Sequence, residues 1–503
     1  MKSILIKVFI IALLTTSITL YYSCNKSNLD LLPHGPTEQS YFTQESDFTK
    51  AVLGIYAKMD DLFWYNGGQD ASTMPIFLLP GDDITTNEAE EFEIFGPIQP
   101  SGGRVTYFYA TWYQLIARAN VLLGKVAAVP DGVYTTPGLK DYHKGEALFL
   151  RGFAFYNLWN YFGTSPLDTA RITSEDQFTP PGTTGTQLLD QAISDLTEAV
   201  SLLPQSWDDA NRGRVIKNSA YGMLGKSLVF RASATNNAAD YTAAITAFNN
   251  ISGASLLTNF GDNFAFDTEN NEESLFEFQA SQAFGFDNVW LSNDFDNAVG
   301  NISVFWGYYD NNYALFGKSP FFGTLKLLNA FNPDDPRLPL TINPSDRTVV
   351  KYVSRNKLDQ PGVGSANNPR LLRYADVLLL KAEAILQSGG STTEAIDLIN
   401  QVRTRARNMV PGGAEPANYS TSETNKETIM NWIMNERLIE LAGEGQRWCD
   451  IRRWQMQGII NLDNAFFSSN TSTMSFQLPK HLLFPIPNSE IDVNPNVQQN
   501  AGY

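Results

Sequence analysis

Cysteine and histidine are scarce in this sequence of 503 residues, which holds two cysteines and three histidines. Cys24 ends an apolar N-terminal stretch, so Cys449 is the one thiol left for the body of the chain and an intramolecular disulfide is not expected. His34, His143 and His481 are far apart, and none lies in an HExxH or Cys/His array, which argues against a zinc enzyme. The fold must be held by packing, and neither a metal nor a cofactor is expected.

Basic residues are too few to balance the acidic ones: 36 Lys and Arg stand against 53 Asp and Glu, which gives a net charge of −17. A field of that sign repels phosphate backbones, so nucleic acid is not expected as a partner. Charged residues make up only 18% of the chain, whereas apolar residues make up 43% and aromatics 12%. That composition predicts a globular protein with a large core, in which many of the rings are buried.

The first 24 residues predict export and lipid anchoring. Lys2 and Lys7 precede an apolar run from Val8 to Leu20, which has the length of a signal peptide and is too short to span a bilayer comfortably. Ser23 stands directly before Cys24, as at a lipoprotein cleavage site. We therefore predict a signal peptide over 1–23 and acylation of Cys24, with an ordinary secretory signal cut nearby as the alternative.

Helical periodicity is the strongest signal after residue 40. Thr186 to Leu203 carries a single apolar stripe at helical spacing, and Pro204 ends it. Its small and apolar positions match the second helix of a tetratricopeptide repeat, although the helix pairs do not recur at a fixed period of about 34 residues. Further helices are expected over 143–161, 220–230, 241–248, 371–386 and 391–406. The predicted fold class is mainly α: a tetratricopeptide-like helical-repeat superhelix with an irregular, loop-rich insertion subdomain.

Two long insertions interrupt the helical pattern, over residues 61–105 and 254–370. Both are rich in Gly, Asn, Asp, Pro and aromatics, with short strand-like runs such as Ser274 to Phe278. We expect loops and small hairpins outside the helical core. Loops on a rigid scaffold are where binding residues usually lie.

One part of the second insertion, Asp287 to Tyr313, interleaves aromatic rings with amides and carboxylates. Sugars present flat CH faces that stack on rings, and hydroxyls that pair with Asn and Asp. The alternative is a satellite core beneath a long loop. The rings predicted as ligand contacts are Trp290, Trp306, Tyr308, Tyr309 and Tyr313.

Motifs for catalysis are weak or missing. The string Ala220 to Ser227 fits a relaxed Walker A pattern, but it follows polar residues and lies inside a helical pattern, unlike a phosphate-binding loop. GxSxG is absent. Carboxylate pairs exist at Asp82 and Asp83 and at Asp294 and Asp296, but a retaining glycosidase needs two about 5 Å apart, which a sequence does not show. An enzyme is not expected, and a glycoside hydrolase remains the alternative of another class.

Several segments resemble the SusD/RagB family, in the same order and over nearly the whole chain. They are LDLLPHGPTEQSYFTQESDFTKAVLGIY, YATWYQLIARAN, KGEALFLRGFAFYNLWNYFG, RYADVLLLKAEAIL, AIDLINQVRTRA, NERLIELAGEGQRWCDIRRW and the final LFPIPNSEIDVNPNVQQNAGY. Taken by themselves, the mixed charges from Glu436 to Arg453 predict ion pairs between helices, and Trp448 and Trp454 are expected in the core or at an interface.

The resemblance implies one SusD-like domain over 24–503, anchored by lipid in the outer membrane and facing the cell exterior. It implies a lid on a SusC-like TonB-dependent transporter that captures an oligosaccharide or polysaccharide, or in some relatives a peptide, without catalysis. It also places sugar contacts in the first insertion. By position these would be Asp82, Asp83, Phe92 and Phe95, with Trp64 and Tyr65 as a further candidate pair.

Overall fold

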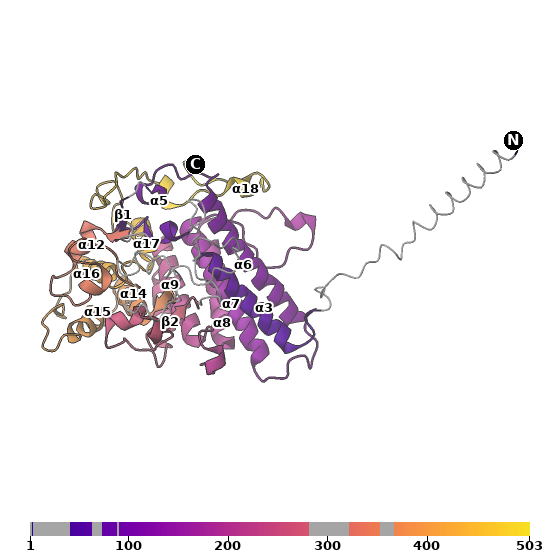
Figure 1. Cartoon of the computed structure of the whole chain (residues 1–503), viewed down its shortest axis with the longest axis horizontal. Coiled ribbons are helices and arrows are strands. Elements are labelled where there is room, and N and C mark those ends of the chain that lie inside the picture. Colours follow the sequence, from indigo (N-terminus) through magenta and orange to yellow (C-terminus); the bar gives the residue numbers. More distant parts are fainter. Residues whose placement is uncertain (1–2, 4–40, 63–72, 88–89, 281–320, 353–366) are drawn as a thin grey trace.

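The computed structural model describes residue 3 and residues 41–62, 73–87, 90–280, 321–352 and 367–503 (Figure 1). Helices dominate these ranges, which confirms the predicted mainly α class. The long helices are α3 Glu45–Lys58, α6 Gly103–Ala128, α7 Leu139–Tyr161, α8 Gln187–Leu202, α9 Lys217–Thr235, α10 Ala238–Asn249, α14 Tyr374–Gln387, α15 Thr392–Asn408, α16 Lys426–Glu440 and α17 Arg447–Gln457. The short helices are α4 Met74–Leu78, α5 Glu91–Ile94, α12 Leu325–Ala330, α13 Leu338–Thr341 and α18 Asn488–Ile491, and single turns include η2 Met59–Leu62 and η4 Asp209–Asn211. The strands are β1 Ile84–Thr86, β2 Ser274–Glu277, β3 Phe321–Gly323 and β4 Arg370–Arg373.

Consecutive helices pack as pairs, α7 with α8, α9 with α10 and α14 with α15. Figure 1 shows α3, α6, α7 and α8 at one side of the molecule and α14 to α16 at the other, with α9 between them. Helix α8 forms where its apolar stripe predicted it, with Leu189, Leu196 and Ala199 buried. Helix α15 begins at a side-chain cap, because the Ser391 side chain accepts a hydrogen bond from the Glu394 amide. The superhelical stacking of the pairs stays a prediction.

Small residues let helices α9 and α10 approach closely. A Cβ atom at Gly225 would lie 2.3 Å from the ring of Phe248, far inside van der Waals contact. Gly225 belongs to the Walker-like string 220–227, all of which lies within α9. The string therefore forms a helix interior and not a phosphate-binding loop.

The strands join distant parts of the chain and do not form the local hairpins expected in the insertions. Strand β1 pairs antiparallel with β3, so the first insertion is bonded to the second, and β2 pairs with β4. A short local bridge does occur in the second insertion, where Ile342 pairs antiparallel with Val349, while the named strands take their register from partners far away in the sequence. Residues 370–373 pair with β2, which is why the helix expected from 371 begins instead at Tyr374.

One contiguous core runs through these elements, and it includes the fully buried Trp112, Trp159, Trp448 and Trp454. Hydrogen bonds hold the C-terminal segment against this core. The side-chain nitrogen Nδ2 of Asn500 donates to the backbone carbonyls of Phe162 and Phe484, at 2.8 and 2.6 Å. Within the described ranges, no helix combines the length and the apolar character needed to cross a membrane.

Candidate functional site

The aromatic residues predicted to contact ligand fall outside the described part of the chain, as does the predicted lipidation site. These residues are Trp64, Tyr65, Trp290, Trp306, Tyr308, Tyr309, Tyr313 and Cys24. The longest undescribed segment that holds such residues is 281–320, and the residues on either side of it are held by backbone hydrogen bonds. The amide of Phe278 donates to the carbonyl of Pro369 at 3.0 Å, and Phe321 opens strand β3 opposite Thr86.

Asp82 and Asp83 lie in the interior, where a ligand has no access. The Asp82 carboxylate accepts from the Nε and Nη2 atoms of Arg447, and the ammonium of Lys326 lies 2.6 Å from it. Burial by itself raises the pKa of Asp82, but these two cations hold it below its ordinary value. Burial raises the pKa of Asp83 to about 6, although its carboxylate accepts from the amide of Gly443 at 2.9 Å. Both residues therefore have a structural role.

Phe92 and Phe95 are buried too, at 0% and 1% exposure. The Phe92 ring packs on Phe484, with 5.3 Å between centroids. The Phe95 ring lies 4.8 Å from that of Phe476 and stacks on His481. Since both rings dock the C-terminal segment on α5, neither has a free face for a sugar. The expectation that these four residues form a wall of the site does not fit the structure.

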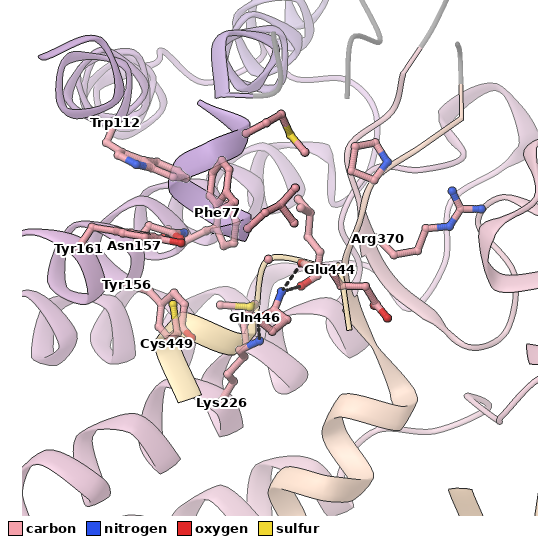
Figure 2. Close-up of a pocket in the computed structure, with 18 of the residues that line it drawn as sticks. Phe77, Trp112, Tyr156, Asn157, Tyr161, Lys226, Arg370, Glu444, Gln446 and Cys449 are labelled. Atoms are coloured by element: carbon pink, nitrogen blue, oxygen red, sulfur yellow. Dashed lines mark hydrogen bonds between the residues drawn. The ribbon is translucent and has the colours of Figure 1, made fainter. Parts of the chain in front are cut away.

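A cavity of about 60 Å³ lies between helices α4, α6, α7 and α9 and the turn that precedes α17 (Figure 2). Figure 2 shows Phe77 and Trp112 on one side of it, and Lys226 and Gln446 on the other. Lys226 donates to Asp376 at 2.8 Å and to the side-chain oxygen of Gln446 at 2.6 Å. The volume has room for a few water molecules but falls far below the ~300 to 1,000 Å³ of ordinary ligand pockets.

The cavity borders parts of the chain that the structure leaves undescribed. Met74 lies just after 63–72, while Tyr352 and Pro369 flank 353–366, and all three line the cavity. Its thiol, Cys449, is buried, and burial raises the pKa of that thiol to about 11, which makes it a poor nucleophile. Cys449 is therefore not poised for nucleophilic chemistry in this cavity.

An ion-pair network underlies the cavity. Glu444, which lines it, accepts from Lys351 at 2.7 Å and from Arg373 at 2.8 Å. Glu440, one turn earlier, meets Arg337 at 2.9 Å and Arg373 at 3.1 Å. These pairs of Glu440 and Glu444 fix the turn that leads into α17. The predicted ion pairs between helices are confirmed by other contacts of 436–453: Arg437 pairs with Asp376 on α14, and Glu440 with Arg405 on α15. Trp448 and Trp454 are buried, as predicted.

Sequence reasoning missed the polar side of the cavity, formed by Lys226, Glu444 and Gln446. The available signal was a lysine among the small and apolar residues of helix α9. Such a lysine has to find a carboxylate inside the fold, because leaving it buried and unpaired is costly. The sequence did not indicate that Asp376, on α14, would be that partner.

Comparison with known proteins covers most of the chain. Residues 332–503 match the model of the SusD family, and residues 81–228 match a family described as "Starch-binding associating with outer membrane". A SusD-like protein of Formosa agariphila is 26% identical over 92% of this chain and 94% of its own length. A second one is 29% identical over 69% of this chain and 72% of its own.

The fold is also shared with solved structures. That of a laminarin-binding SusD-like protein superimposes with a TM-score of 0.73 at 22% identity, covering 92% of this chain and 100% of the other. The matched family models cover a segment of the N-terminal half and the C-terminal third of the chain, and two of these three similar proteins align over 92% of it. The chain belongs to the SusD/RagB family.

Proposed function

We propose that this chain is a non-catalytic, lipid-anchored protein of the outer membrane that binds an oligosaccharide or polysaccharide at the cell surface and delivers it to a SusC-like TonB-dependent transporter. One observation carries the proposal: residues 81–228 match the family described as starch-binding and associated with the outer membrane. The structural neighbour that binds laminarin supports a glycan as the ligand class.

The ligand contacts are assigned to the aromatic side chains of 287–313. Trp290, Trp306 and the neighbouring tyrosines alternate there with amides, a combination suited to stacking on sugar rings and pairing with hydroxyls. The scaffold holds both ends of the surrounding segment, through the backbone bond from Phe278 to Pro369 and the pairing of β3 with β1. Fixed ends reduce the entropy lost when a loop closes on a ligand.

Membrane attachment is assigned to Cys24, after removal of residues 1–23, with residues 24–503 forming the SusD-like domain. Several acyl chains on one cysteine anchor a protein stably, since each buried methylene contributes about 0.8 kcal/mol. Anchoring keeps the protein beside its transporter in the plane of the membrane. Proximity of this kind raises the effective concentration of captured ligand at the transporter.

The experiment that tests this function is affinity electrophoresis of the soluble chain 25–503 in gels that contain plant, fungal or host polysaccharides. We expect retardation by one of them, and loss of that retardation in Trp306→Ala. Phe178→Ala is the matched control, because Phe178 is 61% exposed but lies outside the proposed site. Retardation by none of the polysaccharides would move the ligand class to peptides, and release of reducing sugar would contradict the absence of catalysis.

A further inference from the structure

Two depressions on the described surface share one wall. The larger has a volume of about 420 Å³ and the smaller about 240 Å³. Arg212, Gly213, Arg214 and Glu277 line both of them. The segment 212–214 is therefore a ridge between two adjoining hollows, which together form a single groove.

Hydrogen bonds and a cation–π contact fix the position of the ridge. Arg214 donates through two nitrogens to the buried carboxylate of Glu146, at 2.8 and 2.5 Å, and its guanidinium lies 4.0 Å from the centroid of the Trp207 ring. Arg212 donates to the backbone carbonyls of Glu269 and Asn270. A ridge with these bonds keeps its shape when a ligand binds, which lowers the entropy cost of binding.

Glycine is required at the centre of the ridge. The backbone of Gly213 has φ of +91°, where L side chains are strained, and a Cβ there would lie 2.3 Å from the side chain of Gln279. The Gln279 side chain packs over this glycine and exchanges two hydrogen bonds with the side chain of Asn270, at 2.8 and 2.9 Å. An amide group therefore forms the crest between the two hollows, and a chain that spans both of them crosses over it.

The lining fits an uncharged, hydroxyl-rich ligand. Its formal charges balance, because two arginines, Arg212 and Arg214, and two carboxylates, Asp60 and Glu277, line the two hollows. A half-buried ring lies in each hollow, Trp207 in the smaller and Tyr56 in the larger. The remaining polar side chains are mostly hydroxyls and amides: Ser206, Asn211, Ser219, Asn270, Asn271, Ser274 and Gln279.

Two segments that line the groove stand, in the sequence, beside parts of the chain that carry predicted ligand contacts. Met59 and Asp60 line it shortly before 63–72, and Gln279 lines it directly before 281–320. We propose that the two hollows form one binding groove for an uncharged oligosaccharide, with a sugar unit in each hollow and the chain crossing over the Gln279 amide that covers Gly213. This inference rests on the proposed glycan-binding function and extends it to the ligand's charge and to a second part of the site.

The test fills each hollow with a bulky side chain at an exposed position. Ala210→Trp obstructs the larger hollow and Ser206→Trp the smaller, while Ala239→Trp and Ser201→Trp place the same side chain on exposed positions outside the groove. Binding of the full soluble chain is measured on the polysaccharide that retards the wild type, and thermal unfolding checks the fold. We expect binding weakened at least about tenfold in both groove variants and unchanged in both controls.

A gentler variant keeps the test decisive if a tryptophan disturbs folding. Leu53 lines the larger hollow and is 48% exposed, so Leu53→Asn removes an apolar contact with little effect on the core. We expect weaker glycan binding with an unchanged melting temperature. Glycan binding by the groove variants as tight as that of the controls would overturn the groove and leave the proposed function intact. Failure of the wild type to bind any glycan would overturn both the groove and the proposed function. Preference for a sulfated or uronate polymer over neutral ones would overturn the assignment of an uncharged ligand.

Discussion

The carboxylate of Asp82 and the guanidinium of Arg447 form a two-pronged ion pair in the interior, between residues separated by 365 positions in the chain. The pair joins the residues before strand β1 to the first turn of α17. It thereby connects the first insertion to the C-terminal helices. The ammonium of Lys326 lies 2.6 Å from an oxygen of the same carboxylate. The Lys326 side chain is 34% exposed, so this second partner of Asp82 is partly solvated.

Asp82→Ala should be far more damaging than Lys326→Ala. Removing Asp82 leaves the buried Arg447 without its carboxylate, which costs about 3 to 5 kcal/mol of unfolding free energy. Removing Lys326 deletes the partly solvated partner alone and should cost less than about 1 kcal/mol. Urea denaturation of both variants provides the comparison, and equal losses would contradict the dominant role given to Arg447.

A buried carboxylate near the same strand makes stability depend on pH. Glu93 accepts hydrogen bonds from the Thr86 amide and the Ser472 hydroxyl, yet burial raises its pKa to about 7 from the ordinary value of 4.5. The folded chain therefore binds this proton more tightly than the unfolded chain does. Its unfolding free energy should rise as the pH falls from about 8 to about 6.5, by an amount on the order of 1 kcal/mol from this group.

Glu93→Gln should remove much of that rise, whereas Glu427→Gln, at an exposed position of α16, should keep it. Burial also raises the pKa of Asp83, which adds to the effect at the lower end of the window. The trend is opposed from about pH 7.5 downward, because burial lowers the pKa of His143 and of His481 from the ordinary value of 6.5 to about 4, so the unfolded chain takes up these protons first. Denaturation curves at several pH values supply the measurement, and equal pH dependence of wild type and Glu93→Gln between pH 8 and 6.5 would count against the assigned role of Glu93.

Replacing either of two helix glycines by alanine should change the unfolding free energy, in opposite directions at the two positions. In Gly225→Ala the added methyl meets the Phe248 ring at 2.3 Å, so we expect a loss of about 1 to 3 kcal/mol from overpacking. In Gly124→Ala the methyl meets nothing within 4 Å on helix α6, so better helix propensity should stabilise the fold by about 0.5 to 1 kcal/mol. Thermal unfolding of the two variants checks both signs, and a gain at Gly225 would show that α9 and α10 separate easily.

The thiol of Cys449 should be unreactive in the folded protein. It is buried, and the pKa of its thiol is raised to about 11, so little thiolate exists near pH 8. Incubation of the soluble chain 25–503 with a thiol-reactive dye should give slow labelling, and the same chain in urea should be labelled fully. Rapid labelling without urea would mean that the cavity beside Cys449 opens to solvent.

How far the sequence predicts this structure depends on where the interacting partners lie. Helix α8 was predicted to within one residue at each end, because its apolar stripe and Pro204 are both local. The burial of Asp82 and Phe92 was not predictable, since Arg447 and Phe484 are hundreds of residues away and no local pattern names them. The strand pairs could not be predicted from the sequence for the same reason. The groove at Gly213 could not be predicted either, since its walls come from separate helices and turns.

The residues on either side of 281–320 are held by main-chain atoms. The Phe278 amide donates to the carbonyl of Pro369, and Phe321 pairs with Thr86 across strands β3 and β1. Backbone donors and acceptors are the same whichever side chain a residue carries. This junction is therefore a suitable place to graft a different segment onto the same helical scaffold.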